Sequence, residues 1–300
     1  GVAAHEIGFD TLLMYTWKDR EKVMDLLANL GGNRVNYGIH TLGGVRRDIS
    51  PEQVQLIVKT MDMLEERTKY YREVASEEKT VIERLSGAGR LTLEDVRKLG
   101  VVGPTARASG LMFDIRRDDA YECYGEIAFD VITDTHCDVY GRTLVRIGEL
   151  LQSYSIIRHL ATNLPDGPIS MKFPRRVPAG EAVARCEAPR GEDIHYVKSN
   201  GTDKPERVHV RAPTMANLQA VPKMLESNYL ADVPIVLAAI DPCFSCTDRM
   251  ILLKEDPDSK GKIIAWGELR EFSLNWYKKE RGLDLSTLRL KKDVSISLCS

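Results

Sequence analysis

Two cysteines at ligand spacing are the clearest chemical signal in the sequence. Cys243 and Cys246 lie three residues apart in the stretch IDPCFSCTDRM, which runs from Ile240 to Met250. A Cys-x-x-Cys step lets two thiolates bind one metal ion from a tight turn. Thioredoxin-like redox pairs share this spacing, but they lie at a helix start in a βαβ unit, a context that the flanking sequence does not predict. Two buried, inert thiols are the third interpretation, and the spacing alone leaves all three open.

A metal at this pair needs further ligands. A closed structural zinc site takes four, and the sequence contains no second pair of Cys or His three residues apart. The other cysteines are isolated from one another: Cys123, Cys137, Cys186 and Cys299. The chain opens without Met, signal peptide or helix cap, while a helical pattern starts near its first residue. We therefore expect missing upstream sequence, and the other ligands come either from scattered residues or from before Gly1.

Two further stretches carry arginines in unusual backbone settings. In CEAPRGEDIHYV, Pro189 fixes a bend and Gly191 permits a close backbone approach, so Arg190 projects from a stiff turn. Its guanidinium is a permanent charge with a planar fork of donors. An ordinary surface or salt-bridged arginine is the plainer interpretation. The stretch GGVRRDI, residues 43–49, is a Gly-Gly turn with two adjacent cations, for which a structural or partner-facing turn is favoured.

Composition narrows the class of protein. The chain has 300 residues, 43% apolar and 29% charged, with a net charge of −2. This balance argues against a nucleic-acid-binding protein, which usually shows a strong basic excess. The run VPIVLAAI, residues 233–240, is less than half of the roughly 18 apolar residues that a membrane span needs. The sparse cysteines indicate a reducing, intracellular compartment rather than a secreted disulfide scaffold.

Periodicity predicts a mainly α fold with a small β element, an α+β class. A capping box at Ser50 opens a long helix to about Ser86, and Thr92 opens a short one. A second long helix, 139–163, has a core-facing stripe. The stripe consists of Leu144, Ile147, Leu151, Tyr154 and Ile157. Other predicted elements are a weak strand over 124–135, a hairpin with arms 194–198 and 207–211, a buried helix before Asp241, and a tail with a turn at 255–262 and a helix over 266–282.

Taken together, these stretches resemble one family. DPCFSC followed by Thr-Asp-Arg is similar to the C-terminal motif of [NiFe]-hydrogenase large subunits, and the arginine resembles that of the membrane-bound, energy-converting group 4. EAPRGE matches the family's arginine loop. Four more stretches also resemble the quinone-site large subunit of respiratory complex I: HTLGGVRRDI, GPTARASGLMFDIRRDDAY, VYGR and VRAPTMANL…LADVPIVLAAIDPC. The complex I relative lacks the cysteine pair and typically carries Lys in place of Arg190, which places the chain on the hydrogenase side.

The resemblance implies roles for individual residues. Cys243 would be a terminal nickel ligand, and Cys246 would bridge nickel and iron. Asp241 and Arg190 would lie over the open coordination position, and Pro189 would shape the pocket around the iron's diatomic ligands. Since an arginine keeps its proton in proteins, a thiolate such as Cys243 is the preferred base in heterolytic H2 cleavage. The family's Arg-x-Cys-Gly-x-Cys motif, which supplies the other two thiolates, would precede Gly1.

Cofactors, partners and location are implied in the same way. We expect a Ni-Fe centre with CO and CN ligands, iron–sulfur clusters in a small hydrogenase subunit, and a magnesium ion near the C-terminal motif. Membrane-arm subunits and a maturation endopeptidase would be partners, without nucleic acid. The subunit would lie on the cytoplasmic face of the membrane, held through partners, in an anaerobic, H2-forming or H2-oxidising complex.

The tail and the shared motifs leave alternatives. Residues 1–249 would form the hydrogenase-like domain, truncated at its N-terminus, and residues 250–300 a C-terminal extension. A maturation protease would cut between Arg249 and Met250, so the chain could be an unprocessed precursor lacking metal, or the extension could be retained to dock on a partner. The resemblance to complex I also allows a non-hydrogenase connector subunit of a quinone or sulfur reductase.

Overall fold

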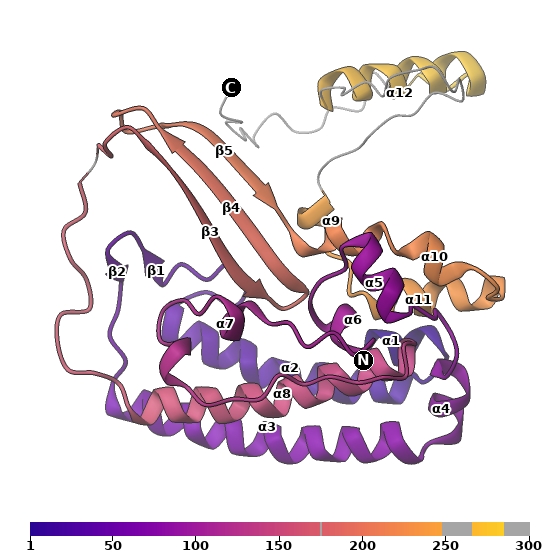
Figure 1. Cartoon of the computed structure of the whole chain (residues 1–300), viewed down its shortest axis with the longest axis horizontal. Coiled ribbons are helices and arrows are strands. Elements are labelled where there is room, and N and C mark those ends of the chain that lie inside the picture. The colour runs from indigo at the N-terminus through magenta and orange to yellow at the C-terminus, as the bar shows by residue number, and fades with distance from the viewer. Residues whose placement is uncertain (175, 248–265, 285–300) are drawn as a thin grey trace. The chain divides into compact units, whose positions relative to one another are not determined.

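The computed structural model describes residues 1–174, 176–247 and 266–284, which fall into two units. The first unit is Gly1–Cys246, and the second is Thr247–Ser300. Long helices and a three-stranded antiparallel sheet dominate the first unit (Figure 1). The described part of the second contains helix α12 (Trp266–Arg281), which confirms the helix predicted in the tail. The predicted turn at 255–262 lies outside the described residues.

Helices and short strands follow one another along the first unit. In chain order they are α1 (Val2–Glu6), α2 (Asp10–Gly31), β1 (His40–Thr41), β2 (Gly44–Val45), α3 (Pro51–Glu77), α4 (Lys79–Leu85), α5 (Leu93–Leu99), α6 (Gly103–Arg107), α7 (Ile115–Asp118), α8 (Val139–Thr162), β3 (Gly180–Ala188), β4 (Gly191–Ser199), β5 (Pro205–Arg211), α9 (Pro213–Leu218), α10 (Val221–Leu225) and α11 (Val233–Ala239), with 3₁₀ turns at Tyr124–Glu126, Leu230–Asp232 and, at the end of this unit, Phe244–Thr247.

The predicted capping box opens α3, but the helix ends earlier than expected. The Gln53 N–H donates to Ser50 Oγ (3.3 Å), and the Ser50 N–H donates to Gln53 Oε1 (3.0 Å). One continuous helix to Ser86 was the wrong prediction, because the backbone of Glu78 is extended. Its carboxylate instead accepts the Thr80 N–H (3.4 Å) and caps α4. A side chain that can cap a new helix thus interrupts an otherwise helical pattern.

Helix α8 lies against α3 and supports the rest of the unit (Figure 1). Side chains of α2, α3 and α8 form one apolar core: Leu26, Ile57, Met61, Leu64, Tyr154 and Ala161. The predicted stripe of α8 is only partly correct, since Tyr154 is buried but Ile157 is 39% exposed. Another face of α8 is buried instead, and it includes Arg142. The apolar pattern could not show this, because a buried arginine does not look like a core residue.

The sheet has the order β3-β4-β5, and the predicted hairpin is confirmed as β4 and β5. The sequence missed β3, which pairs with β4 along its whole length from Gly180↔Ser199 to Ala188↔Gly191. Most of β3 is exposed, and its apolar residues are small apart from Val183, so the sequence gives only a weak strand signal. The register of the pair leaves Pro189 and Arg190 as the turn between β3 and β4.

The weak strand expected over 124–135 does not form. The segment contains a 3₁₀ turn and otherwise irregular backbone. The Asp134 N–H donates to the carbonyl of Arg107 (3.0 Å), and the ring of Phe129 lies 5.1 Å from the guanidinium carbon of Arg116. These contacts satisfy the segment without a strand partner. The predicted Gly-Gly turn does form: Leu42 and Gly43 join β1 to β2, and Gly44 begins β2.

The observed architecture confirms the mainly α, α+β prediction. The short helices α4, α5, α6, α10 and α11 surround a second core, in which Ile235, Val236 and Ile240 are fully buried. Helix α11 begins after Asp232, as predicted, and leads the chain to Asp241. Among the helices that the structure describes, none combines the length and the apolar character needed to cross a bilayer.

Candidate metal site

The two cysteines lie on one short turn after α11. The backbone of Asp241 has a φ of +54°, a left-handed conformation that is uncommon outside glycine. After Pro242 the chain enters the 3₁₀ turn, where the Cys246 N–H donates to the carbonyl of Cys243 (3.1 Å). Both cysteine side chains are partly exposed, and Phe244 between them is 94% exposed. Helix, bend and turn therefore present both thiols together.

The surroundings of the two thiols shift their pKa values in opposite directions. A hydrogen bond from the Ser245 hydroxyl, with Oγ 3.1 Å from Cys243 Sγ, and the donors of Cys246 lower the pKa of Cys243 to about 7. Burial and the neighbouring Cys243 raise the pKa of Cys246, against the opposite influence of the Thr214 hydroxyl and the Arg190 charge. Cys243 is thus the more readily ionised thiol of the pair.

Arg190 reaches the cysteine turn through Asp241. Its Nε donates to the backbone carbonyl of Asp241, and its Nη2 donates to Asp241 Oδ1 (3.1 Å). The two residues are 51 positions apart in the sequence. The planar fork of the guanidinium matches this pair of acceptors. The structure therefore brings Arg190, Asp241 and both cysteines, all of them predicted site residues, to one place.

A close backbone approach at Gly191 and the side chain of Asn217 fix the Arg190 turn. A Cβ at Gly191 (φ +124°) would lie 2.7 Å from the backbone nitrogen of Gly103, so the predicted close backbone approach is confirmed. Asn217, which is fully buried, donates to the carbonyl of Arg190 (3.2 Å) and accepts the N–H of Val102 (3.0 Å). Pro189 lies in the same turn. These contacts orient the arginine without help from its own side chain.

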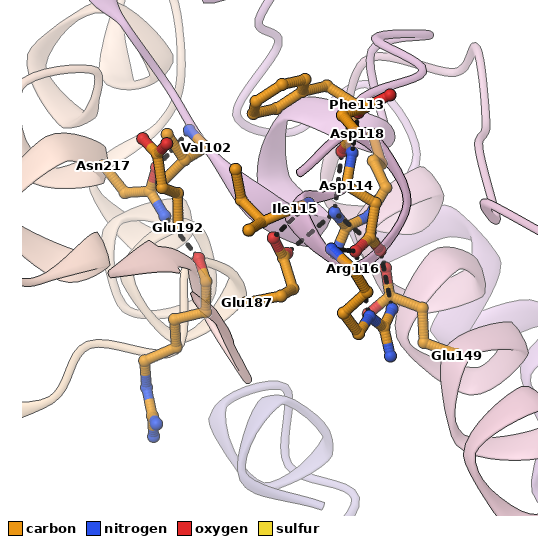
Figure 2. A network of polar contacts seen from close by, with 12 residues as sticks. Val102, Phe113, Asp114, Ile115, Arg116, Asp118, Glu149, Glu187, Glu192 and Asn217 are labelled. Atoms are coloured by element: carbon orange, nitrogen blue, oxygen red, sulfur yellow. Dashed lines mark hydrogen bonds and ion pairs between the residues drawn. The ribbon is translucent and has the colours of Figure 1, made fainter. Parts of the chain in front are cut away.

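A buried ionic network lies directly before this turn (Figure 2). Arg107 is 2% exposed; its Nε donates to Glu149 (2.7 Å), and its Nη1 donates to Glu187 (2.9 Å) and lies 3.4 Å from Asp114. Burial raises the pKa of Glu187 despite the charge of Arg107. Burial alone would also raise the pKa of Asp114, but the hydrogen bonds from Arg116 and the charge of Arg107 outweigh the effect of burial. The pKa of Asp114 is therefore lowered. The network ties the end of β3 to α6, α7 and α8.

A cavity of about 340 Å³ adjoins the site. Asp241 and Gly1 both line it, together with Thr16, Arg142 and Arg146 and mostly apolar side chains. Arg142 is 1% exposed, and two of its nitrogens have no partner among the described residues. Burial lowers the pKa of Arg142 to about 10, against the charge of Asp138. Because Gly1 and Asp241 line the same cavity, the first residue of the chain lies near the start of the cysteine turn.

The donor set suits a soft metal in part. Within residues 1–174, 176–247 and 266–284, no group of three or more His, Cys, Asp or Glu side chains is placed to hold a metal ion. Cys243 and Cys246 offer two sulfur donors, which favour soft metals over magnesium. They amount to half of a four-thiolate set. Arg249 and Met250, the predicted processing site, lie outside the described residues.

Sequence reasoning missed three residues of the site. Thr214 and Asn217 are fully buried polar side chains, and the Thr214 hydroxyl has no partner in hydrogen-bond geometry within the described chain. The Thr214 hydroxyl lies near enough to Cys246 to act against the rise in the pKa of that thiol. Arg146, on α8, contacts Asp241 from the other side. The polar residues of RAPTMANL, set between apolar neighbours, were the available signal for the first two.

Comparison with known proteins places the chain in a family. The model of the family described as "Respiratory-chain NADH dehydrogenase, 49 Kd subunit" matches residues 6–176 and 171–249. The chain belongs to this family. The match includes the Arg190 turn, Asp241 and both cysteines, so the site described above lies within the part that defines the family.

Relatives within the family include hydrogenase subunits. The chain is 41% identical to the membrane-bound hydrogenase subunit alpha of Pyrococcus furiosus over 303 residues, covering 93% of this chain and 68% of that protein. It is 37% identical to the carbon monoxide-induced hydrogenase of Rhodospirillum rubrum over 253 residues, covering 83% and 69%. These similarities fit the complex I-like group 4 hydrogenases and support an oxidoreductase subunit of a membrane-bound complex.

A solved structure shows that the same fold serves another complex. The chain matches a subunit of the membrane-bound sulfane sulfur reductase, an archaeal respiratory membrane complex, with a TM-score of 0.78 and 34% identity. The match covers 82% of this chain and 69% of that one. Fold and family are therefore shared by hydrogenase and non-hydrogenase complexes, and the reaction has to be argued from the site.

Proposed function

We propose that the chain is the catalytic large subunit of a membrane-bound, energy-converting [NiFe]-hydrogenase, which interconverts H2 with two protons and two electrons. The observation that carries the proposal is the Arg190–Asp241 contact directly before Cys243 and Cys246. Two thiolates at ligand spacing beside a fixed guanidinium are donors that suit a soft metal centre. The hydrogenases among the relatives support the proposal further.

Cys243 and Cys246 would hold the Ni-Fe centre, the first as a terminal nickel ligand and the second as the bridge to iron. Soft thiolates are the donors that such a centre requires. The other two thiolates are proposed to come from residues that precede Gly1 in a longer chain. Gly1 lines the same cavity as Asp241. A preceding segment would therefore pass close to the cysteine turn.

When bound, the centre would supply a site for the heterolytic cleavage of H2, from which two electrons would pass to iron–sulfur clusters of a small partner subunit and two protons would leave, one after the other. The residues of this chain orient and move the proton. Since arginine retains its proton, the Cys243 thiolate is the preferred acceptor. Arg190 holds the carboxylate of Asp241 in place, and Pro189 fixes the bend from which the guanidinium projects.

Metal analysis of the assembled, full-length complex tests the proposal. We expect about one nickel per large subunit after maturation and H2-dependent reduction of a viologen dye. Electron donor and ion translocation need not be known for this measurement. A matured complex with four cysteines in the site but without nickel would contradict the proposal.

The cysteine ligands give a sharper test. Cys246→Ser should abolish assembly of the centre, because the Cys246 thiolate would hold both metals. The matched control is Cys186→Ser, which changes a partly exposed cysteine on β3 and should retain nickel and turnover. Nickel analysis and dye reduction check both variants. Parental nickel content in Cys246→Ser would exclude the bridging role.

The arginine gives a test of turnover rather than assembly. Arg190→Lys keeps a positive charge but loses the fork that reaches both acceptors on Asp241. We expect normal nickel content and a kcat lowered by about 10- to 100-fold, the usual range for residues that orient a metal site from outside its ligands. Full turnover in this variant would contradict the role of Arg190.

A second candidate function is a connector subunit that couples a quinone or sulfur reductase to ion pumping. The similarity to the sulfane sulfur reductase complex, at a TM-score of 0.78, favours it. Sequence upstream of Gly1 distinguishes the two, since a second cysteine pair supports the hydrogenase and its replacement supports the connector. A complex that lacks nickel but reduces sulfur or quinone would establish the connector.

The proposal extends to partners and processing. We propose a small iron–sulfur subunit, membrane-arm subunits that hold the chain at the cytoplasmic face of the membrane, and a maturation endopeptidase that cuts at Arg249-Met250. The relatives in membrane-bound complexes support the membrane arm. Intact-mass measurement tests the processing step: a mature chain ending at Arg249 supports it, and retention of residues 250–300 in an active complex excludes it.

A further inference from the structure

One face of α8 and its N-cap carries four polar residues that reach into the protein. Asp138, Arg142, Arg146 and Glu149 follow at spacings of four, four and three, which places them on one side of a helix. Together they contact three segments: the loop after α4, the end of α11, and α6. Asp138 accepts the N–H of Gly87 (2.8 Å), Arg142 donates to the carbonyl of Gly89 (2.7 Å), Arg146 donates to the carbonyl of Ala239 (3.2 Å), and Glu149 accepts from Arg107 (2.7 Å).

Arg146 is the member of this row that reaches the cysteine turn. Its Nη2 binds the carbonyl of Ala239, the last residue of α11, and its Nη1 lies 4.0 Å from Asp241 Oδ2. Arg190 binds the other carboxylate oxygen, Oδ1, at 3.1 Å. The carboxylate of Asp241 therefore lies between two guanidiniums, one from α8 and one from the β3–β4 turn.

This arrangement holds a backbone that would not otherwise be favoured. Asp241 adopts a φ of +54°, a conformation that persists only when the surroundings determine it. Arg146 binds the carbonyl of Ala239, two residues before Asp241, and both arginines face the carboxylate of Asp241. Cys243 follows two residues later, so a change in the conformation of Asp241 would displace the first thiolate.

We propose that Arg146 is a positioning residue of the metal site, acting through Ala239 and Asp241 rather than by contact with the reacting atoms. Removal of its guanidinium would free one oxygen of Asp241 and the end of α11. The two thiols would then be presented less rigidly, and a bound centre would experience a changed electrostatic environment. The link to turnover rests on the hydrogenase function proposed above, whereas the link to the turn itself does not.

The test compares Arg146→Gln, Arg146→Lys and Arg158→Lys in the full-length assembled complex. Arg158 is the matched control, because it lies on the same helix but pairs with Asp62 and Glu65 away from the cysteines. Hydrogen–deuterium exchange of the peptide spanning 239–246 reports on the turn whether or not metal is present. We expect exchange to rise by about tenfold in Arg146→Gln, equal to about 1.4 kcal/mol of lost protection, and to be unchanged in Arg158→Lys.

The second readout addresses the site itself. In a nickel-containing complex, Arg146→Lys should keep its metal and its KM for H2, lower kcat by about 10- to 100-fold, and shift the infrared bands of the metal-bound diatomic ligands. Parental exchange in Arg146→Gln overturns the proposal. Parental infrared bands and kcat in Arg146→Lys also overturn it. Absence of nickel from the parent complex contradicts the hydrogenase function instead, and the exchange measurement still decides the role of Arg146.

Discussion

The turn that carries Arg190 and the turn that carries Cys243 and Cys246 meet at Asp241, but they are held in different ways. Buried groups of the chain fix the arginine turn: Gly191 packs against a neighbouring backbone, and the fully buried Asn217 binds the arginine carbonyl. The cysteine turn is short and partly exposed, with Phe244 94% exposed. One side of the site is thus held inside the fold, and the other is presented outward.

This difference indicates a division of labour. Residues that lie around a metal site and are already rigid, such as those of the arginine turn, need no reorganisation when a metal centre binds. The thiolates, in contrast, must be reachable for a metal to be inserted. The arginine side should therefore be sensitive to changes deep in the fold, and the cysteine side to changes in its own local hydrogen bonds. Substitutions on each side test that expectation.

The largest effect is expected from Arg107→Met, beneath the arginine turn. The change leaves the buried carboxylates of Asp114 and Glu187 and the partly buried carboxylate of Glu149 without their shared cation. Breaking a buried ion pair from one side costs about 3–5 kcal/mol of unfolding free energy. Chemical denaturation of the full-length protein measures it. Arg158→Met, which breaks partly exposed ion pairs, is the control and should cost about 0–1 kcal/mol of unfolding free energy. Equal losses of unfolding free energy in both variants would show that the buried network stabilises the fold no more than exposed ion pairs do.

A smaller effect is expected from Gly191→Ala, inside the arginine turn. The new Cβ would lie 2.7–2.8 Å from backbone atoms of Val102 and Gly103, which cannot rotate away. Gly201→Ala is the matched control, since Gly201 also has a positive φ (+87°) but nothing lies within 4 Å of the added atom. We expect Gly191→Ala to cost about 1–3 kcal/mol more than the control. Equal stabilities would show that the turn can shift without strain.

The smallest effect is expected from Ser245→Ala, in the cysteine turn. Without the hydroxyl bond, the pKa of Cys243 should rise from about 7 toward the ordinary thiol value. The hydroxyl stabilises the ionised form, so its contribution is present at high pH and is lost as pH falls through about 7. Alkylation of Cys243 in the metal-free chain, followed by peptide mapping, should be slower than parental at about pH 7, and the two rates should converge at alkaline pH. Identical pH profiles would exclude the hydrogen bond as the cause, and a large loss of folding stability would contradict the local character of this side.

Prediction from the sequence succeeded where the signal is local. The capping box at Ser50, the end of α8 near residue 163 and the hairpin around Asn200-Gly201 all depend on residues a few positions apart. It failed where packing decides. The helix break at Glu78, the exposed strand β3 and the irregular segment 124–135 gain their conformations from neighbours that the pattern does not contain. The candidate site followed the same rule: the sequence singled out Cys243, Cys246 and Arg190, which the structure brings to one place, but it gave no such indication for Thr214, Asn217 and Arg146.

By itself, the sequence determined the two thiols on one turn, the stiff Pro-Arg-Gly bend and the need for glycine at 191, because each depends on covalent geometry and steric limits within a few residues. Only the tertiary structure decided that Arg190 binds Asp241 across 51 positions, that Asn217 holds the arginine turn, and that Arg146 faces the same carboxylate from α8. The physical reason is that hydrogen bonds and ion pairs between distant segments exist only after apolar packing has brought those segments together.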